Sequence, residues 1–431
     1  MAMTTISAKI KALMAASLDL AKQVVSRLAA TPISGILALV VALGLALAVR
    51  YPLLEFKSQD FFASLKPWYN SIRGEGFSIF ATNFSTYSPP YLYLLYLIAR
   101  FIPDTPVVLA VKLPGLIADF ICAYLIYRIV RLKHQGRVEA LLAGFAVLFA
   151  PTVILNSAFW GQADSLFTAG ILACVYFLLV RRYLWAFFAF GIALSFKLQA
   201  IFLGPLLVAL FLRGEIRWKY LLLVPAILVL SLMPAWIAGR PPLELFNIYS
   251  FQTSQFEFIT MNAASLYAWL PGTKQVFNLF YVPGVIMGAT IAFLLVVVIY
   301  KSSRELSKPL VLELSLLTMM IVPFFLPKMH ERYFFPADIL SIAFAFYYPQ
   351  FYFVPLMVIG VSFLSYEPFL FNSELVPLPI LTLLLLCAIS LISYHAFSEM
   401  YAFTAEVAQA PSENSGEKNG IEPAPIEGDA G

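Results

Sequence analysis

Long apolar segments recur along almost the whole chain, separated by short polar loops. Of the 431 residues, 61% are hydrophobic and only 12% are charged, against about 25% charged in ordinary soluble domains. A membrane-spanning helix needs about 20 mostly apolar residues, so the chain can supply on the order of a dozen spans. This pattern excludes a soluble enzyme, a secreted disulfide scaffold and a nucleic-acid-binding protein. It predicts an all-α polytopic membrane protein.

Basic clusters predict the orientation of the spans, because Lys and Arg gather in cytoplasmic loops. Residues 1–32 carry four basic residues at helix-like spacing and are expected to form a cytoplasmic amphipathic segment. Placing residues 131–137, 181–182 and 301–308 inside gives 12 spans within residues 33–396, with both termini in the cytoplasm. The predicted spans are 33–50, 107–130, 138–155, 166–180, 183–212 (counted as two), 220–237, 282–300, 310–326, 334–348, 353–365 and 380–393.

The segment 183–212 allows two topologies. It is apolar except for Lys197 at its middle, and basic clusters border both of its ends. One long tilted helix is an alternative, but both clusters are cytoplasmic only if the chain turns near Lys197. We therefore predict a hairpin of two short spans. Residues 397–431 are acidic and contain too few apolar residues to fold, which predicts a disordered cytoplasmic tail.

Two long loops, about 51–106 and 238–281, lie outside in this topology. In the first, Asp60 opens an amphipathic pattern in which Phe61, Leu65 and Trp68 recur at helical spacing. The apolar run Tyr91–Phe101 is too short to cross a bilayer, so both segments are predicted to be helices lying along the interface. Asp60 itself is either a solvated residue at a helix start, where Asp is favoured, or a functional residue.

Three further polar clusters fall on the same predicted outer face. They are NSAFWGQADSLF (156–167), SFKLQ (195–199) and LPKMHERYFFPAD (326–338). Charges in or near spans are costly and are therefore functional candidates. Lys112 and Asp119, seven residues apart on one helical face, either pair with other helices or take part in function.

The motifs of soluble enzymes are absent from the sequence. It contains no Gly-rich phosphate loop, HExxH, CxxC or nucleophile elbow. The outer loops contain no paired DxD carboxylates, and His330 has no partner for a metal site. Cys122, Cys174 and Cys387 lie far apart in apolar stretches and are expected only to pack there. We therefore predict neither a metal nor a cofactor.

Several of these segments together resemble the GT-C superfamily, whose members are multispanning glycosyltransferases that use polyprenyl-phosphate sugars. The resemblance extends from the early Asp60 through a YSPP turn, WGQAD and FKLQ to KMHERYFFPAD, the most specific piece. A weaker match is MNAASLYAWLP (261–271). The most similar group is the bacterial relatives of glycosylphosphatidylinositol mannosyltransferase II. The dolichol-pathway glucosyltransferases are similar more distantly and carry Lys where this chain has Arg332.

The resemblance implies roles for individual residues. Asp60 is similar to the catalytic aspartate of the first outer loop, and His330 and Arg332 correspond to the segment that lines the donor phosphate. Lys197 and Gln199 match a lysine–glutamine pair. Lys197 and Lys328 join the expected phosphate-binding set. Residues expected to bind the sugar or the acceptor are Tyr87, Trp160, Gln162, Asp164, Gln199, Asn262 and Glu331.

The chemistry agrees with that assignment. A polyprenyl-phosphate sugar already carries a good leaving group, so one carboxylate suffices to accept the proton of the acceptor hydroxyl. Direct displacement inverts the anomeric centre. The resemblance thus implies a metal-independent, inverting sugar transferase, most similar to mannosyltransferases, with glucose as the other donor sugar. Its partners would be a polyprenyl-phosphate donor, a lipid or glycan acceptor and membrane lipids. Its expected location is the bacterial plasma membrane, with the site extracytoplasmic.

Two other classes fit part of the same pattern. A secondary transporter can have 12 spans with both ends inside, although transporters commonly carry internal repeats and place their charges near the midplane. We detect no internal repeat here. A lipid-to-glycan ligase is a smaller alternative.

Overall fold

The computed structural model describes residues 32–254 and 256–401. The predicted amphipathic segment 1–32, apart from its last residue, lies outside the described residues. The predicted tail beyond Tyr401 also lies outside the described residues.

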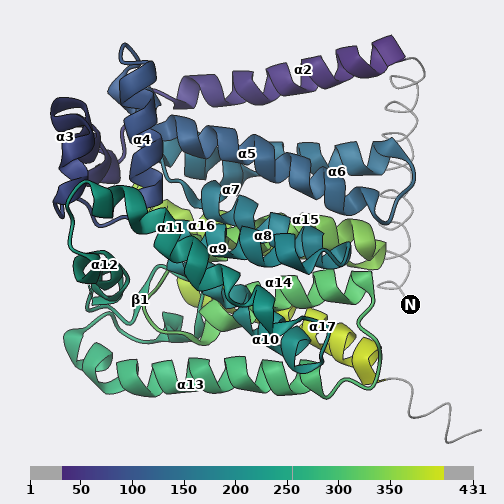
Figure 1. Ribbon diagram of the computed structural model, residues 1–431. Coiled ribbons are helices and arrows are strands. Elements are labelled where there is room, and N and C mark those ends of the chain that lie inside the picture. Colours follow the sequence, from purple (N-terminus) through teal and green to yellow (C-terminus); the bar gives the residue numbers. More distant parts are fainter. Residues whose placement is uncertain (1–31, 255, 402–431) are drawn as a thin grey trace, which may run out of the picture.

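Helices run back and forth between two ends of a bundle, and the described chain begins and finishes at the same end (Figure 1). That end also holds the loops 131–137, 181–182 and 301–308, and we call it the basic end. The helices of the bundle are α2 (Pro32–Arg50), α5 (Val107–Arg131), α6 (Arg137–Phe149), α8 (Asp164–Leu179), α9 (Tyr183–Phe196), α10 (Gly204–Leu212), α11 (Leu223–Ile237), α13 (Lys274–Tyr300), α14 (Lys308–Phe325), α15 (Phe335–Tyr347), α16 (Val354–Phe371) and α17 (Leu378–Tyr401).

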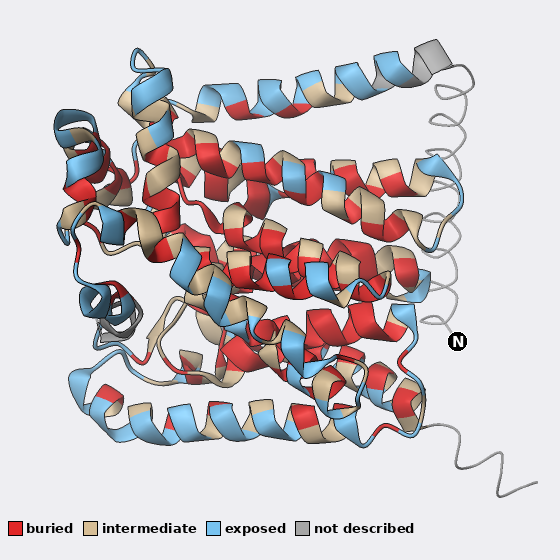
Figure 2. Ribbon diagram, in the orientation of Figure 1, coloured by how far each residue is buried: buried red, intermediate tan, exposed pale blue. Residues whose placement is uncertain are grey.

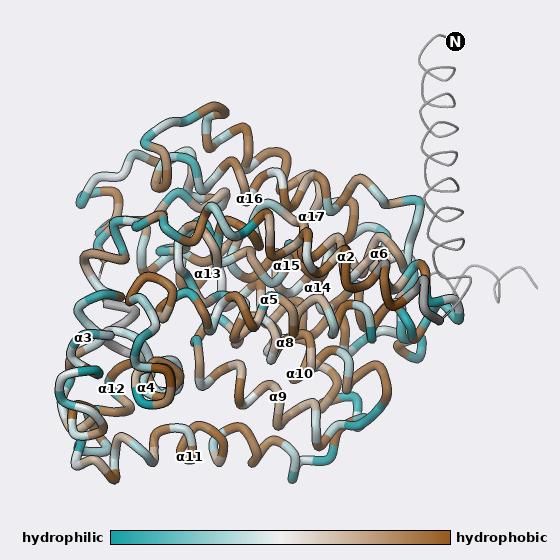
Figure 3. The backbone as a smooth tube through the Cα atoms, turned by 90° about the horizontal axis from the view of Figure 1, so that it is seen from above, coloured by the Kyte–Doolittle hydropathy of each residue, from teal (hydrophilic) through white to brown (hydrophobic). Residues whose placement is uncertain are grey.

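The other end, which we call the site end, carries shorter elements. They are α3 (Lys66–Glu75), α4 (Pro89–Phe101), α12 (Pro242–Ser254), and two short parallel strands, β1 (Thr260–Met261) and β2 (Met329–His330). The two predicted interfacial helices of the first loop are therefore present as α3, with the turn before it, and α4. Hydrophilic residues gather at the two ends of the bundle and hydrophobic ones along the helices between them (Figure 3).

Within the described residues, six helices are long and apolar enough to cross a membrane. A seventh crossing results if α6 and the segment Pro151–Trp160, bent by 49°, form one span. The remaining predicted spans coincide with α15 and with shorter apolar helices. The all-helical polytopic fold is thus confirmed, while twelve as the number of crossings stays a prediction.

Burial separates a central layer of helices from peripheral ones. The most apolar window of α14 is 83% buried, whereas those of α13 and Trp218–Ile237 are 22% and 11% buried. Helices α2, α11 and α13 expose many apolar residues. Buried residues concentrate in α5, α8, α14 and α15 (Figure 2). An apolar outer face is what a membrane-embedded bundle requires, because lipid replaces water around it.

The segment 183–212 is a hairpin, as predicted. Lys197 has extended backbone angles (φ −148°, ψ 135°) that end α9, and a 3₁₀ turn, Leu198–Leu203, leads into α10. Arg181 before α9 pairs with Glu305, and Arg213 after α10 donates a hydrogen bond to the Ser302 carbonyl (2.9 Å). Both ends of the hairpin therefore lie beside the 301–308 loop.

Three helices extend several residues beyond the predicted spans. Helix α13 begins at Lys274 rather than 282, α16 continues to Phe371, and α17 continues to Tyr401. The outer loop 238–281 and the tail 397–431 are correspondingly shorter than predicted. Hydropathy detects the lipid-facing part of a helix, but helices continue into polar turns; Thr273 Oγ1, for example, caps α13 by accepting from the Val276 amide (3.4 Å).

Lys112 and Asp119 make structural contacts, in line with the first of the two alternatives given for them above. Asp119 forms a fully buried ion pair with Arg50 of α2 (3.1 Å). The Lys112 ammonium donates to the carbonyls of Leu53, Leu54, Phe56 and Ala158 at 2.7–3.1 Å. Both side chains thus connect α5 to the chain segments that support the site end.

The orientation of the bundle can be tested by labelling. In a background with Cys122, Cys174 and Cys387 replaced, single cysteines at the exposed positions Ser78 and Lys274 should react with an impermeant maleimide in intact cells. A cysteine at exposed Ser303, next to buried Ser302 at the basic end, should react only after permeabilisation. Labelling of Ser78 with protection of Lys274 would contradict the hairpin, because the two positions would then lie on opposite faces.

Candidate functional site

Asp60 lies at the site end, at the start of a helical segment whose apolar face is buried as predicted. A π-turn, Phe61–Leu65, follows it and continues into α3; Phe61 and Leu65 are buried. Ser58 Oγ accepts from the Phe61 amide (3.2 Å) and donates to the Trp160 carbonyl (2.9 Å). These contacts hold the Asp60 carboxylate, 31% exposed, against the segment 155–164.

The segment 155–164 is shaped by close backbone packing. A π-turn, Leu155–Trp160, ends at Gly161, whose φ of +85° is a left-handed conformation that favours glycine. The Gln162 carbonyl oxygen passes so near Gly115 of α5 that a Cβ there would lie only 2.7 Å from it. This backbone path turns the side chains of Trp160 and Gln162 toward Asp60, and that of Asp164 toward Lys197.

One oxygen of Asp60 accepts two hydrogen bonds. Trp160 Nε1 donates to Oδ2 at 2.9 Å, and Gln162 Nε2 donates to the same atom at 2.6 Å. Tyr87 Oη in turn donates to Gln162 Oε1 (2.8 Å). Among the described residues, no donor contacts Asp60 Oδ1.

Arg332 lies at the centre of the site, among three carboxylates. Its guanidinium nitrogens are 4.0 Å from Asp60 Oδ2, 3.7 Å from Asp164 Oδ2 and 3.6 Å from Glu331 Oε1. Its planar head also lies over the Trp160 ring, 5.1 Å from the centroid. Glu331 is buried (3% exposed) and Arg332 is 14% exposed. Arg332 therefore balances the acidic groups and still reaches the surface of a cavity.

Asp164 is enclosed in a way that Asp60 is not. It forms an ion pair with Lys197, accepts from Asn156 Nδ2 (2.8 Å) and has a side chain only 1% exposed. Lys197 lies over the Tyr87 ring (5.4 Å). Asp164 is thus paired with the Lys197 ammonium, which lines the cavity.

The KMHERYFFPAD segment enters the site through the short parallel strand pair. Met261 pairs with His330, and the Lys328 amide donates to the Ile259 carbonyl (2.7 Å). Lys328 has a positive φ of 62°, and burial lowers the pKa of its ammonium, an effect that the Glu257 carboxylate opposes. Asn262 forms an isolated bridge with His330. Asn262 is thus joined to the strand pair through its backbone.

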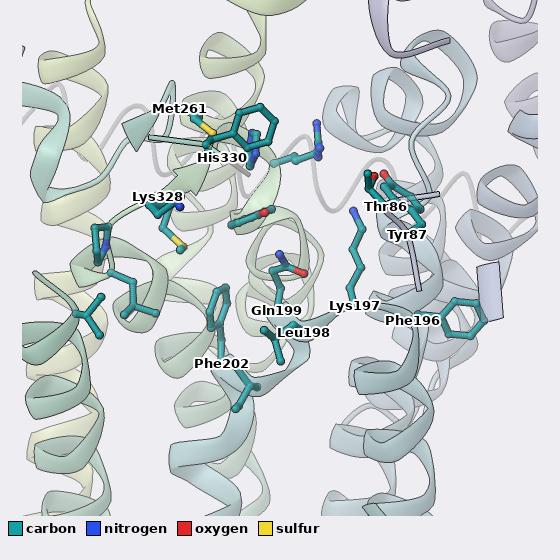
Figure 4. Close-up of a pocket in the computed structure, with 18 of the residues that line it drawn as sticks. Thr86, Tyr87, Phe196, Lys197, Leu198, Gln199, Phe202, Met261, Lys328 and His330 are labelled. Carbon is teal, nitrogen blue, oxygen red and sulfur yellow. The ribbon is translucent and has the colours of Figure 1, made fainter. Parts of the chain in front are cut away.

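A cavity of about 400 Å³ opens beside these groups. Lys197, Gln199, Lys328 and His330 gather around it from separate chain segments (Figure 4). Its apolar wall comes from the turn after Lys197 and from α13. The lining residues are Thr86, Tyr87, Phe196, Lys197, Leu198, Gln199, Ile201, Phe202, Phe256, Met261, Tyr281, Val285, Leu326, Pro327, Lys328, Met329, His330, Arg332 and Tyr333.

The predicted site residues, far apart in sequence, come together at one end of the bundle. Six of them line the cavity: Tyr87, Lys197, Gln199, Lys328, His330 and Arg332. Asp60 and Asp164 lie next to Arg332, as do Trp160 and Glu331, while Gln162 contacts Asp60. Asn262 borders the site without lining the cavity.

Sequence reasoning missed some residues of the site. Asn156 lies inside a quoted cluster, eight residues before Asp164, but its hydrogen bond to Asp164 depends on the chain turn at Gly161, which the sequence pattern did not indicate. Phe256 and Tyr281 belong to the cavity wall. They are apolar or aromatic residues in an apolar chain, so no sequence signal distinguishes them.

Comparisons with known proteins bear on the fold. No protein-family model matches the chain, and no curated protein matches it. Among solved structures, the chain is similar to the crystal structure of ArnT from Cupriavidus metallidurans bound to undecaprenyl phosphate. The TM-score is 0.50 at 12% sequence identity, over 84% of this chain and 77% of that one. The chain thus shares the fold of ArnT, which agrees with the all-helical polytopic architecture predicted from the sequence.

Proposed function

We propose that this protein is an inverting glycosyltransferase that moves a sugar from a polyprenyl-phosphate donor to a lipid or glycan acceptor. The observation that carries the proposal is one partly exposed carboxylate, Asp60, beside a cavity lined by Lys197, Lys328, His330 and Arg332. The shared fold with ArnT, crystallised with undecaprenyl phosphate, supports a donor of this class. Mannose is the proposed sugar, on the sequence resemblance alone.

The proposed reaction needs one base and a phosphate clamp. The acceptor hydroxyl gives its proton to Asp60 as its oxygen bonds to the anomeric carbon. The bond between that carbon and the phosphate oxygen breaks, and polyprenyl phosphate leaves with the electron pair. The configuration at the anomeric carbon inverts. Arg332 would hold the phosphate with a bidentate fork, and Lys197 and Lys328 would add point charges.

The cavity wall also suits a lipid-linked donor. Ile201 and Val285 are apolar, line the cavity and are also exposed on the outside of the bundle. An isoprenoid chain could leave the cavity between them into lipid, while the phosphate stays near Arg332. We propose this arrangement for the donor.

The alternative function is a secondary transporter with a polar outward-facing cavity. The position of the charges favours the enzyme: Asp60, Arg332 and His330 lie at the site end, not near the middle of the spans where transporters bind their substrates. Reconstituted protein separates the two. With radiolabelled polyprenyl-phosphate mannose and extracted membrane lipids, we expect label in a new product; accumulation of a solute inside vesicles without any transfer would support transport.

The proposed transfer should not depend on a divalent metal. Each of the nearby carboxylates, Asp60, Asp164 and Glu331, already has Arg332 within 4.0 Å, so a dication would have to displace that cation. We expect full transfer activity in excess EDTA, measured beside an untreated sample. Loss of activity that Mn²⁺ or Mg²⁺ restores would contradict this and would indicate a ligand role for Asp164.

We further propose the location that the sequence predicts. The protein would lie in a bacterial plasma membrane with the site end extracytoplasmic, where a lipid-linked donor can supply sugar without a nucleotide. The cysteine labelling described above tests this orientation.

A further inference from the structure

The hydrogen bonds around Asp60 distinguish its two carboxylate oxygens. Oδ2 accepts from Trp160 Nε1 (2.9 Å) and Gln162 Nε2 (2.6 Å), whereas Oδ1 has no donor among the described residues. The carboxylate is 31% exposed, and Arg332 is nearer to it through Oδ2 (4.0 Å). One oxygen is thus held by the protein, and the other is available to a substrate.

The orientation of the Gln162 amide depends on a third residue. An amide can be flipped by 180°, and its oxygen would then face the Asp60 carboxylate and repel it. Tyr87 Oη donates to Gln162 Oε1 (2.8 Å), which holds the amide oxygen away from Asp60 and the NH₂ group toward it. Burial raises the pKa of the Tyr87 phenol above its ordinary value. The phenol therefore stays protonated and remains a donor.

We propose that Tyr87 and Gln162 are positioning residues for the catalytic base. Tyr87 fixes the amide of Gln162, and Gln162 together with Trp160 holds Oδ2 so that Oδ1 is presented to the acceptor hydroxyl. This rests on the proposed function and changes the role of three residues. Sequence resemblance suggested sugar or acceptor binding for Tyr87, Trp160 and Gln162, whereas their contacts point to the base itself.

The other groups facing Asp60 must be kept constant in a test. The charged and titratable ones are Arg332, Glu331 and His330 of the KMHERYFFPAD segment, Asp164 of α8, Lys197 after α9, and Tyr87 before α4. Replacing Gln162 alters the contacts of only one of them, Tyr87, whose hydroxyl donates to Gln162 Oε1. The variant Gln162→Leu removes the NH₂ group that donates a hydrogen bond to Asp60. The variant Gln162→Glu replaces the amide with a second carboxylate.

The decisive readout is the pH dependence of transfer, because a merely structural role would not move it. A carboxylate that loses a hydrogen-bond donor binds its proton more tightly, so the acidic limb of the kcat/KM profile should move upward by about one pH unit in Gln162→Leu. It should move further in Gln162→Glu. The KM for the donor should stay unchanged in Gln162→Leu, since Gln162 does not line the cavity.

Tyr87→Phe tests the third residue while keeping the ring over Lys197. We expect kcat to fall roughly 3- to 10-fold, as for the loss of one hydrogen bond. The matched control is Tyr91→Phe: that ring packs against Tyr87 (5.2 Å), but its hydroxyl donates to the Val111 carbonyl (3.3 Å), away from Gln162. The control should behave as wild type.

The outcomes separate this inference from the proposed function. If the wild-type protein transfers sugar but the acidic limb is unmoved in both Gln162 variants, the positioning role is wrong and the proposed function stands. An equal loss in Tyr87→Phe and Tyr91→Phe would likewise overturn the role of Tyr87. If the wild type transfers no sugar from any polyprenyl-phosphate donor, the proposed function itself fails.

Discussion

Asp60→Asn should lower sugar transfer by about 10²–10⁴-fold, the usual contribution of general-base catalysis. The amide keeps the size of the side chain and can still accept from Trp160 and Gln162 through its oxygen, but it cannot take the acceptor's proton at neutral pH. Binding of the donor should be largely kept, because Asp60 does not line the cavity. Single-turnover transfer with a verified lipid-linked donor measures the effect, and donor binding is measured separately.

Glu75→Gln is the matched control for this substitution. Glu75 is an exposed carboxylate at the end of α3, in the same loop as Asp60. It should retain wild-type activity. If Asp60→Asn also transfers sugar at a near-normal rate, Asp60 is not the base. Asp164 is the other candidate, but its 1% exposure and its ion pair with Lys197 fit a holding role better than proton transfer.

Arg332→Ala should weaken donor binding as well as rate, and this is the second large effect. The donor carries the phosphate charge before the reaction starts, so losing a charged hydrogen bond to it costs roughly 10- to 100-fold in affinity. The same change leaves Asp60, Asp164 and Glu331 without the cation that lies within 4.0 Å of each. We therefore expect kcat to fall too. Donor titration and single-turnover rates measure both.

Arg332→Lys and Arg100→Ala serve as comparisons. Lysine restores the charge but not the fork or the planar contact with Trp160, so it should rescue only part of the loss. Arg100 is exposed on α4, and Arg100→Ala should leave donor binding and transfer rate unchanged. Wild-type donor affinity in Arg332→Ala, with correct folding verified, would contradict the phosphate role. Lys197→Ala should resemble Arg332→Ala, because it also removes the partner of buried Asp164.

Much of the fold could be predicted because lipid imposes simple rules on sequence. Most apolar stretches became helices, although 138–155 is broken after Phe149, and the basic loops indicated which ends lie together. Even the turn at Lys197 followed from the clusters on both sides, and the structure confirms it through Arg181 and Arg213. The ends of α13 and α17 could not be predicted, since polar turns extend a helix without an apolar signal.

The candidate site was predictable as a set of residues but not as an arrangement. Charged and polar residues near spans are costly, which singled out Asp60, Asp164 and Arg332. Sequence could not show that Asp164 is buried beside Lys197 whereas Asp60 is partly exposed, because that difference comes from packing between α8, α9 and the loop before α3. Nor could the sequence show that Lys112 donates to backbone carbonyls whereas Lys197 lines the cavity.

One measurement tests the central claim most directly: the release of polyprenyl phosphate and the transfer of sugar, followed together in one sample. Purified wild-type protein in EDTA, given radiolabelled polyprenyl-phosphate mannose and membrane lipids, should release one polyprenyl phosphate for each sugar transferred. Asp60→Asn should show both at rates about 10²–10⁴-fold lower. Equal transfer by wild type and Asp60→Asn, or no transfer by the wild type from any polyprenyl-phosphate sugar, would contradict the account.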